Sequence, residues 1–313
     1  MTPPSRRSTF RDLALVAAAA LGVGWPARAA AQACCAGGAL VNPTRLAPYE
    51  DASAGVQLRA RAAFGSFGAS GQFTASRTEQ ELEQDLAGSF RIARRAQGGV
   101  VLPFVETRRV ESGQASTGSG LGDLALTGRY DFALASEMLY WPGFALVGSL
   151  IFPTGKAAGS GTNAAGTDAT GTGTLNASLG AAFEKIHGAL YFDVQAWVTY
   201  SRDRTVDTPG FGSTTTSFPL QLTALGVVGL VFDSEAALAA YVSFLDRGDT
   251  SLNGAAQPGT ELRLTTAGLS GLLPIGERWR LQGTLYGDVP LDHFGRNEQA
   301  SGGVTVALVR LWM

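Results

Sequence analysis

The chain has 313 residues and is 45% hydrophobic but only 16% charged, whereas typical soluble domains carry roughly 25% charged residues. Its formal net charge of −2 gives no reason to expect nucleic acid as a partner. The longest apolar run has about half of the roughly 20 residues that a spanning helix needs, which excludes a helical membrane protein. The length of the whole chain fits one large all-β domain or two ordinary domains.

The N-terminus is typical of a cleaved secretory signal peptide, predicted to comprise residues 1–33. Arg6, Arg7 and Arg11 precede an apolar run over residues 13–23, and small residues follow as far as Ala33. Several alanines between positions 29 and 33 satisfy the small-residue rule for cleavage, so the cleavage site stays open. The start loosely resembles a twin-arginine signal, but its Phe10 lies one place late, and ordinary secretion is the favoured interpretation.

Two adjacent cysteines, Cys34 and Cys35, follow the predicted signal and would enter an oxidising compartment. Adjacent cysteines pair only through a strained bond, so an intermolecular disulfide, a metal contact and lipid attachment all remain open. Lipid attachment favours a Leu-like residue three places before the cysteine, where Ala31 stands. The segment 34–51 is predicted to lie in the periplasm or to enter the mouth of the domain that follows.

From residue 52 onward, apolar and polar residues alternate, as expected for β-strands with one apolar and one polar face. The run WRLQGTLYGDVP, residues 279–290, alternates without interruption. Segments of this kind between turn residues predict about twelve strands. They are 53–65, 82–95, 99–109, 120–133, 143–152, 172–184, 189–201, 218–232, 236–245, 260–273, 278–289 and 303–313.

The connections between these strands alternate between long and short along the whole chain. A soluble β-sandwich has no reason to sort its connections in this way, whereas an outer-membrane barrel has short periplasmic turns and long extracellular loops. The long connections are 66–81, 110–119, 153–171, 202–217, 246–259 and 290–302, and the short ones are 96–98, 136–142, 185–188, 233–235 and 274–277.

Aromatic residues lie at strand ends, where two membrane interfaces are expected, such as Phe132 and Trp279 beside short turns and Phe152 beside a long connection. We therefore predict that residues 52–313 form an all-β fold, a transmembrane antiparallel β-barrel of about 12 strands. An even strand number places both termini in the periplasm of a Gram-negative bacterium, with the barrel in its outer membrane. The predicted partners are the lipid bilayer, the outer-membrane assembly machinery and a small-molecule solute, and the default oligomeric state is a monomer.

The polar strand faces are predicted to line the barrel lumen. They would form either a salt-bridged interior that stiffens the barrel or a polar pathway whose charges tune selectivity. Twelve strands lie between filled and open barrels, so an open and a plugged lumen both remain, with a narrow or gated pathway favoured. The candidate lumen-lining or substrate-binding residues are Arg59, Arg61, Arg91, Asp123, Arg129, Asp131, Glu184, Asp193, Arg263, Arg280 and Asp288, together with Arg310.

Three glycine-rich stretches, GSGLGDLALTGRYDF (118–132), PGFALVGSLIFPTGK (142–156) and GTGTLNASLGAAFEK (171–185), resemble an outer-membrane transporter family named for the meta-cleavage pathway of phenol degradation. The resemblance covers about half of the chain and is carried by Gly122, Asp123, residues 153–156 and residues 171–174. It implies an outer-membrane barrel that moves small molecules, hydrophobic or aromatic compounds among them. The last strand also resembles the C-terminal strand that the assembly machinery recognises, although it ends in Met313 rather than Phe.

Other motifs carry less. The sequence PTGK lacks the spacing and the following helix of a phosphate loop. The repeated Gly-Thr pattern after it predicts a flexible extracellular loop. A calcium site needs several oxygen-bearing side chains, and this loop has the single acidic residue Asp168. His187 and His293 are predicted solvated loop residues, although His293 beside Asp292 leaves an outer-membrane hydrolase as the least favoured alternative.

The predicted function is an outer-membrane channel or transporter for small solutes, with no enzymatic activity, no metal and no cofactor. The alternative is a structural or surface-interaction barrel whose long loops are the working part.

Overall fold

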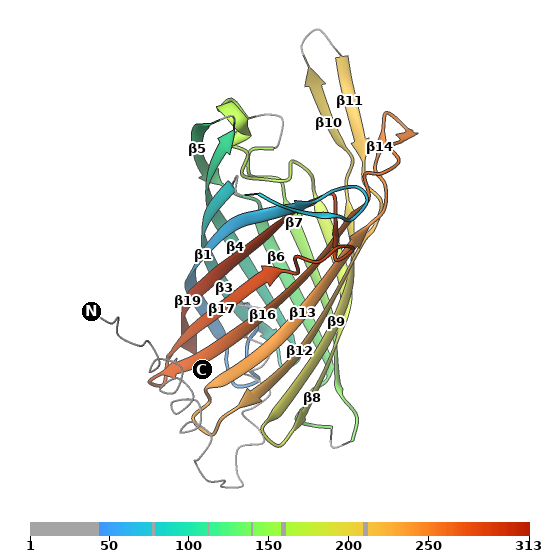
Figure 1. The fold of residues 1–313 in the computed structure, drawn as a ribbon. Helices are drawn as coiled ribbons and strands as arrows, with labels where there is room; N and C mark the ends of the chain where they lie inside the picture. Colours follow the sequence, from blue (N-terminus) through green and yellow to red (C-terminus); the bar gives the residue numbers. More distant parts are fainter. Residues whose placement is uncertain (1–43, 77–78, 112, 139, 158–160, 209–211) are drawn as a thin grey trace, which may run out of the picture.

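The computed structural model describes residues 44–313 except 77–78, 112, 139, 158–160 and 209–211, so the predicted signal peptide and the two cysteines lie outside it. The described chain is a closed barrel of twelve long antiparallel strands (Figure 1), which confirms the predicted fold. The twelve are β1 (Ala52–Phe67), β3 (Glu79–Ala93), β4 (Ala96–Glu111), β6 (Leu124–Ala133), β7 (Gly143–Phe152), β8 (Asn176–His187), β9 (Leu190–Ser201), β12 (Gln221–Val231), β13 (Ala237–Arg247), β16 (Leu262–Ile275), β17 (Trp279–Asp288) and β19 (Glu298–Trp312).

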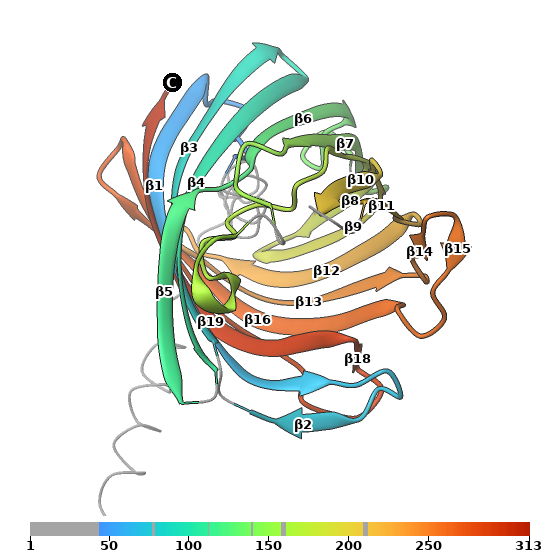
Figure 2. The same cartoon turned by 90° about the horizontal axis from the view of Figure 1, so that it is seen from above.

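The barrel closes because each long strand pairs with its neighbours along the chain and the first pairs with the last. The ladder between β1 and β19 runs from Ala52 opposite Trp312 to Phe67 opposite Glu298, with one irregularity near Ala63. Seen from above, the strands form a ring (Figure 2). Because the barrel is closed, no long strand has a free edge with unpaired backbone N–H and C=O groups, and a sheet without such edges is stable in lipid.

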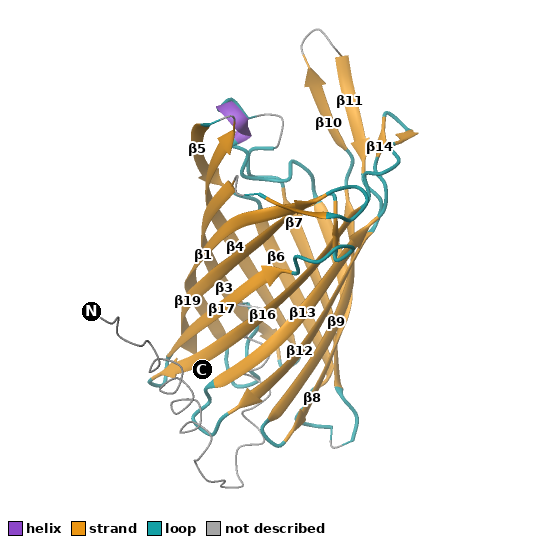
Figure 3. Cartoon of the chain, in the orientation of Figure 1, coloured by secondary structure: helices purple, strands orange, loops and turns teal. Residues whose placement is uncertain are grey.

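The two ends of the barrel differ as predicted. One end, here called the turn end, carries the short connections and both chain ends of the barrel, where the Asp51 backbone N–H donates to the Trp312 carbonyl at 2.8 Å. The other end, the loop end, carries the long connections, which hold short elements that the sequence did not predict (Figure 3). These are β2 (Phe73–Ala75), β5 (Gln114–Leu121), η1 (Ala164–Gly166), β10 (Arg204–Thr208), β11 (Gly212–Ser217), β14 (Ser251–Leu252), β15 (Ala255–Ala256) and β18 (Gly295–Arg296).

The predicted strand 120–133 is broken in the structure into β5 and β6. Both pair with β4, but Gly122 and Asp123 interrupt the run where Pro103 faces them. A side chain at Gly122 would approach the Pro103 ring to 2.8 Å, and Pro103 has no N–H to continue a ladder. The break lets the β4–β5 hairpin rise above the barrel at the loop end (Figure 1).

Alternation sorts the side chains between the two faces of the wall. Large apolar residues such as Leu179, Val194 and Leu285 are 58–63% exposed on the outer face, which is the pattern of a surface that meets lipid. Near the turn end, ring contacts of 4.9–5.3 Å join Tyr130, Phe132, Phe144 and Phe183 in a row across β6, β7 and β8. Such a row matches the aromatic girdle of a membrane interface.

The inner face is polar over much of the ring, but part of it is apolar. A buried cluster on β9, β12, β13 and β16 brings together Tyr191, Leu225, Val227, Val231, Ala237, Ala239 and Leu272. The prediction of a polar interior therefore holds for much of the lumen but not for this cluster. Among the described residues, none belongs to a helix with the length and apolar character to cross a membrane.

Candidate functional site

The segment before β1 lies inside the barrel at the turn end. Thr44, Leu46 and Ala47 are buried although they belong to no strand. The Leu46 backbone N–H donates to Gln97 Oε1 at 3.0 Å, and the Thr44 and Thr127 hydroxyls are 3.2 Å apart. Of the described residues 44–51 of the predicted segment 34–51, residues 44–50 thus lie inside the mouth of the barrel. We call residues 44–50 the plug segment.

Glu50 fixes the plug segment at the point where β1 begins. Its side chain is fully buried and forms an ion pair with Arg280 of β17, and its other carboxylate oxygen accepts from the Ala47 backbone N–H at 2.7 Å. Arg91 of β3 donates to the carbonyl of Glu50 at 2.9 Å and also to that of Ala47. Two predicted lumen residues, Arg91 and Arg280, therefore lie inside the barrel and hold the plug segment.

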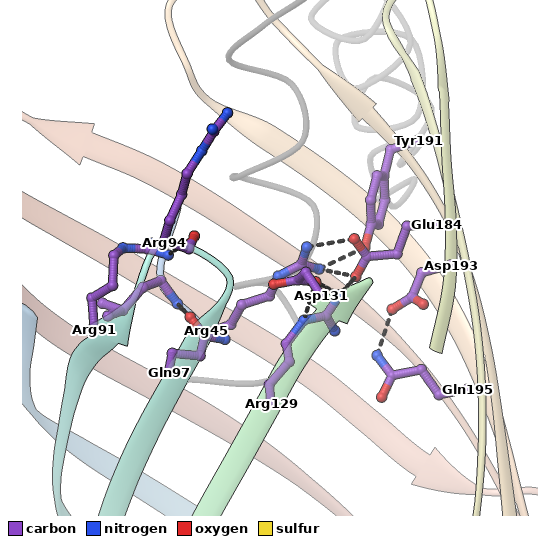
Figure 4. Close-up of polar contacts among 11 residues, drawn as sticks. Arg45, Arg91, Arg94, Gln97, Arg129, Asp131, Glu184, Tyr191, Asp193 and Gln195 are labelled. Carbon is purple, nitrogen blue, oxygen red and sulfur yellow. Dashed lines mark hydrogen bonds and ion pairs between the residues drawn. The ribbon is translucent and has the colours of Figure 1, made fainter. Parts of the chain in front are cut away.

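The tip of the plug segment carries Arg45, whose guanidinium pairs with both carboxylate oxygens of Glu184 on β8 (Figure 4). It also lies 3.4 Å from the Tyr191 hydroxyl. Arg129 of β6 bridges Glu184 at 3.1 Å and Asp131 at 2.7 Å. Burial lowers the pKa of the Arg45 guanidinium, but Glu184, Tyr191 and Asp131 together outweigh burial and raise that pKa above its ordinary value.

We call Arg45, Arg129, Asp131, Glu184, Tyr191, Asp193 and Gln195 the Glu184 cluster. Asp193 lies opposite Glu184 in the β8–β9 ladder and accepts from Gln195 Nε2 at 2.6 Å. Strand alternation placed four of these residues, Arg129, Asp131, Glu184 and Asp193, on the lumen face. It missed Arg45 and Glu50, because the plug segment has no periodic pattern that would place it in the barrel.

A second group of predicted residues lines a lumen cavity of about 340 Å³ on the walls formed by β1, β13, β16, β17 and β19. Arg59 and Arg61 face this cavity from β1 and form ion pairs with Glu83 and, at 2.9 Å, Glu81 on β3. The other lining groups are mainly amides, hydroxyls and phenols, including Gln57, Gln282, Thr284, Tyr241 and Tyr286. The cavity is suited to a small solute that accepts and donates hydrogen bonds.

Asp288 also lines the cavity, but its carboxylate is committed to the wall. It accepts from the Thr266 hydroxyl at 2.5 Å and from the Ser301 backbone N–H at 2.8 Å and hydroxyl at 3.1 Å. These bonds join β16, β17 and β19, so Asp288 braces three strands next to the cavity.

Asp123 lies at the loop end rather than deep in the lumen. One carboxylate oxygen accepts from the Gly155 backbone N–H at 3.0 Å, and the other accepts from the Thr172 N–H at 2.7 Å and hydroxyl at 2.8 Å. A side chain at Gly171 would collide with Asp123. The three glycine-rich stretches that carry the family resemblance therefore meet at this carboxylate.

Asp123 thereby anchors the connection between β7 and β8, which reaches over part of the barrel opening towards β5 (Figure 2). The connection is also tied to the β4–β5 hairpin, where Ser116 and Thr167 hydroxyls are 3.0 Å apart and Arg109 donates to the Ala165 carbonyl. Side chains remote in sequence thus contact the described part of this connection, which the sequence predicted to be a flexible loop.

Replacing Asp123 with Ala is expected to free this connection. Three backbone or hydroxyl donors would lose a charged acceptor, and hydrogen bonds to charged groups contribute about 1.5–3 kcal/mol each. We expect limited proteolysis of the refolded variant to cleave within residues 153–175 at least about tenfold faster. Asp249→Ala, which removes a similar loop contact with Thr260 N–H, is the control and should leave that cleavage rate unchanged.

Asp168 braces the same connection from within, through bonds to Lys156, Thr162 and Asn163, and this brace has a defined pH dependence. The Lys156 ammonium, followed by the Thr162 N–H, lowers the pKa of Asp168 well below its usual range. Since the folded-state pKa is the lower one, the stabilisation is fully present above about pH 4 and declines only as the pH falls through the folded value. We expect equal protease protection of the connection at pH 7 and pH 5, and reduced protection at both pH values in Asp168→Asn. A loss of protection between pH 7 and pH 5 in the unsubstituted chain would contradict this.

Arg263 and Arg310 are not in the lumen, so their prediction as lumen residues is wrong. Arg263 pairs at 3.0 Å with Asp246, and its guanidinium lies 5.9 Å from the ring of Phe244. It alternates with Leu264 and Thr266, which do line the cavity, and therefore points outward at the loop end. Arg310 lies 5.8 Å from the ring of Trp279 and 5.2 Å from that of Trp312, on the outer face at the turn end.

Asp292 and His293, the residues that suggested a hydrolase, form hydrogen bonds that connect two loops. Asp292 Oδ1 accepts from the Phe73 backbone N–H at 2.9 Å, and the backbone N–H of His293 donates to the Gly71 carbonyl at 2.8 Å. These bonds join the β17–β19 connection to the β1–β3 connection. No group of three or more His, Cys, Asp or Glu side chains suited to a metal ion occurs in the part of the chain that the structure describes.

Comparison with known proteins supports the architecture. No family model matches the sequence, so the family resemblance noted above stays a prediction, and no curated protein matches it either. Among solved structures, an outer membrane channel from Pseudomonas putida F1 is similar with a TM-score of 0.71 and 18% sequence identity, covering 87% of this chain and 98% of that one. The translocator domain of the autotransporter NalP from Neisseria meningitidis is similar with a TM-score of 0.52 and 10% identity, covering 88% of this chain and 93% of that one. The chain thus has the fold of an outer-membrane β-barrel.

Proposed function

We propose that the protein is a gated channel for small solutes in the outer membrane of a Gram-negative bacterium. The observation that carries the proposal is a polar cavity of about 340 Å³ enclosed by a closed barrel whose outer face is apolar. The similarity to the Pseudomonas putida outer membrane channel supports it. By the general rule for such barrels, the turn end and both chain ends face the periplasm and the loop end faces outward.

The proposed solute is small, neutral or weakly charged, and able to hydrogen-bond. Tyr241 and Tyr286 stand among the hydroxyls of the cavity, so an aromatic solute with polar substituents is included in the proposal. The barrel is proposed to work as a monomer, after export behind residues 1–33 and insertion by the outer-membrane assembly machinery. No step of the proposed function requires a cofactor.

Liposome swelling tests this function. Folded protein is placed in liposomes that are transferred into solutions of arabinose, glucose, sucrose or a hydroxylated benzene, and heat-shifted gel mobility verifies that the barrel is folded. We expect swelling that falls as solute size rises. Swelling rates equal to those of protein-free liposomes for every solute, with and without the plug segment, would refute the proposal.

A second candidate function is favoured by one observation, the sheet formed by β10, β11, β14 and β15, which stands above the barrel at the loop end (Figure 1). Such a sheet would serve a surface-interaction barrel. Deletion of residues 204–217 distinguishes the two functions: a transport barrel keeps its swelling rates, whereas an interaction barrel loses an adhesion or envelope property while swelling is absent throughout.

A further inference from the structure

The Glu184 cluster has the charge balance of a cation site that the chain fills with its own side chain. Asp131, Glu184 and Asp193 contribute three carboxylates, and the guanidiniums of Arg45 and Arg129 face them. Arg129 is fixed on β6, whereas Arg45 comes from a segment outside the barrel wall. If Arg45 leaves, three carboxylates face one cation in a closed space, which is unfavourable unless another cation enters.

One carboxylate oxygen of Asp193 is free to accept a hydrogen bond from a ligand. Its side chain is only 1% exposed, and its Oδ1 has no hydrogen-bond partner among the described residues. The carboxylates of Asp193 and Glu184 come from facing positions of β8 and β9 and point to the same side, towards Arg129 (Figure 4). A buried carboxylate oxygen without a donor is costly, so it marks a position where a ligand N–H would be stabilised.

A cavity of about 150 Å³ adjoins the cluster and gives a solute room beside it. Arg45, Arg129, Gln195 and Trp197 line it together with small hydroxyl-bearing residues. The Trp197 indole adds a ring face of the kind that attracts cations. The cavity therefore offers amide, hydroxyl and aromatic groups to a small molecule, and its lining residues Arg45 and Arg129 join it to the carboxylates of the cluster.

The chemistry of the cluster selects one class of cation. No set of three or more carboxylate, His or Cys side chains in the described chain converges as a metal ion requires. Arg45 instead binds both oxygens of Glu184 with two nitrogens, the fork geometry of a planar cation with several N–H donors. A solute that competes for this position needs the same planar set of donors.

We propose that the Glu184 cluster is a binding site for small guanidinium or amidinium cations, and that such a solute displaces Arg45 and releases the plug segment from the turn end. Binding of the cation and release of the plug segment would then be one exchange reaction at one carboxylate, distinct from the passage of neutral solutes through the lumen. Opening of the channel upon release rests on the function proposed above, whereas the exchange of cations at Glu184 does not.

The test measures release of the plug segment directly. Leu46→Cys, at a position that is 4% exposed, is placed on a Cys34→Ser, Cys35→Ser background, and the rate of modification by a water-soluble maleimide is followed in detergent micelles. Methylguanidinium chloride is compared with tetramethylammonium chloride, which has the same charge and no N–H donor. Ala47→Cys, at a position that is 1% exposed, repeats the measurement at an adjacent residue, and heat-shifted gel mobility verifies folding throughout.

We expect methylguanidinium to raise the modification rate about tenfold or more with saturation, and tetramethylammonium to leave it unchanged. Arg45→Lys replaces the forked competitor with a single point charge, so half-maximal release should occur at a concentration about tenfold lower. Equal effects of the two salts, or equal half-maximal concentrations with Arg and Lys at position 45, would overturn the proposal. Release of the segment without any solute flux would refute the channel and leave the cation site standing.

Discussion

A chain that lacks residues 44–49 is expected to pass small neutral solutes at least about tenfold faster than the full chain. The plug segment is held at the turn end by the Arg45–Glu184 ion pair, by Gln97 and by Arg91, so its release has to break all of these contacts. Loss of a buried charge pair alone corresponds to about 3–5 kcal/mol, which is more than a hundredfold in a two-state equilibrium. Liposome swelling with arabinose measures the difference.

Glu50 is kept in this deletion because its carboxylate pairs with Arg280. Removal of Glu50 would leave the Arg280 guanidinium buried without a counter-ion. Arg94→Ala is the matched control, since the Arg94 side chain is 85% exposed at the same end of the barrel and contacts only Glu137 among the described acidic residues. Its swelling rate should equal that of the full chain. Equal rates for the deletion and the full chain, in barrels with the same heat-shifted mobility, would show that the segment does not limit flux.

Replacing Glu184 with Ala is expected to destabilise the barrel by about 3–5 kcal/mol, because the guanidiniums of Arg129 and Arg45 lose their shared buried partner. The measurement is the urea midpoint of unfolding in lipid or detergent, followed by gel mobility. Glu137→Ala removes exposed ion pairs to Arg94 and Arg95 and should change the free energy of unfolding by less than about 1 kcal/mol.

The two guanidiniums differ in one respect that a double-mutant cycle detects. Arg45 can leave with the plug segment, whereas Arg129 stays on β6 with only Asp131 as its partner. The cost of Glu184→Ala should therefore be smaller in the chain without residues 44–49 than in the full chain. Identical costs in both backgrounds would mean that Arg45 does not interact with Glu184 in the folded barrel.

Much of the wall follows from alternation and turn residues. The strand over 143–152 was predicted with the bounds that β7 has, and the inner positions of Arg129, Asp131, Glu184 and Asp193 follow from it as well. These features are local, because a period of two assigns each side chain to a face as soon as one face is known to be apolar.

Two kinds of feature were beyond such a pattern. The plug segment has no alternation, and Arg45 meets a partner 139 positions away in the chain. At strand ends, the outer face leaves the hydrocarbon and meets water and headgroups, so charged residues are tolerated on both faces. Arg263 and Arg310 lie at such ends beside aromatic rings, and for that reason polarity alone assigned them to the wrong side.

The central claim is that the protein is a solute channel gated from its turn end. The most direct test is the conductance of the folded full chain in a planar bilayer, compared with that of the chain without residues 44–49. The account predicts brief, small current steps for the full chain and larger, long-lived steps for the deletion, with an ion preference that shifts towards cations in Arg59→Glu, since Arg59 lines the lumen cavity. Silence from both chains, with heat-shifted mobility proving that both are folded, would contradict it.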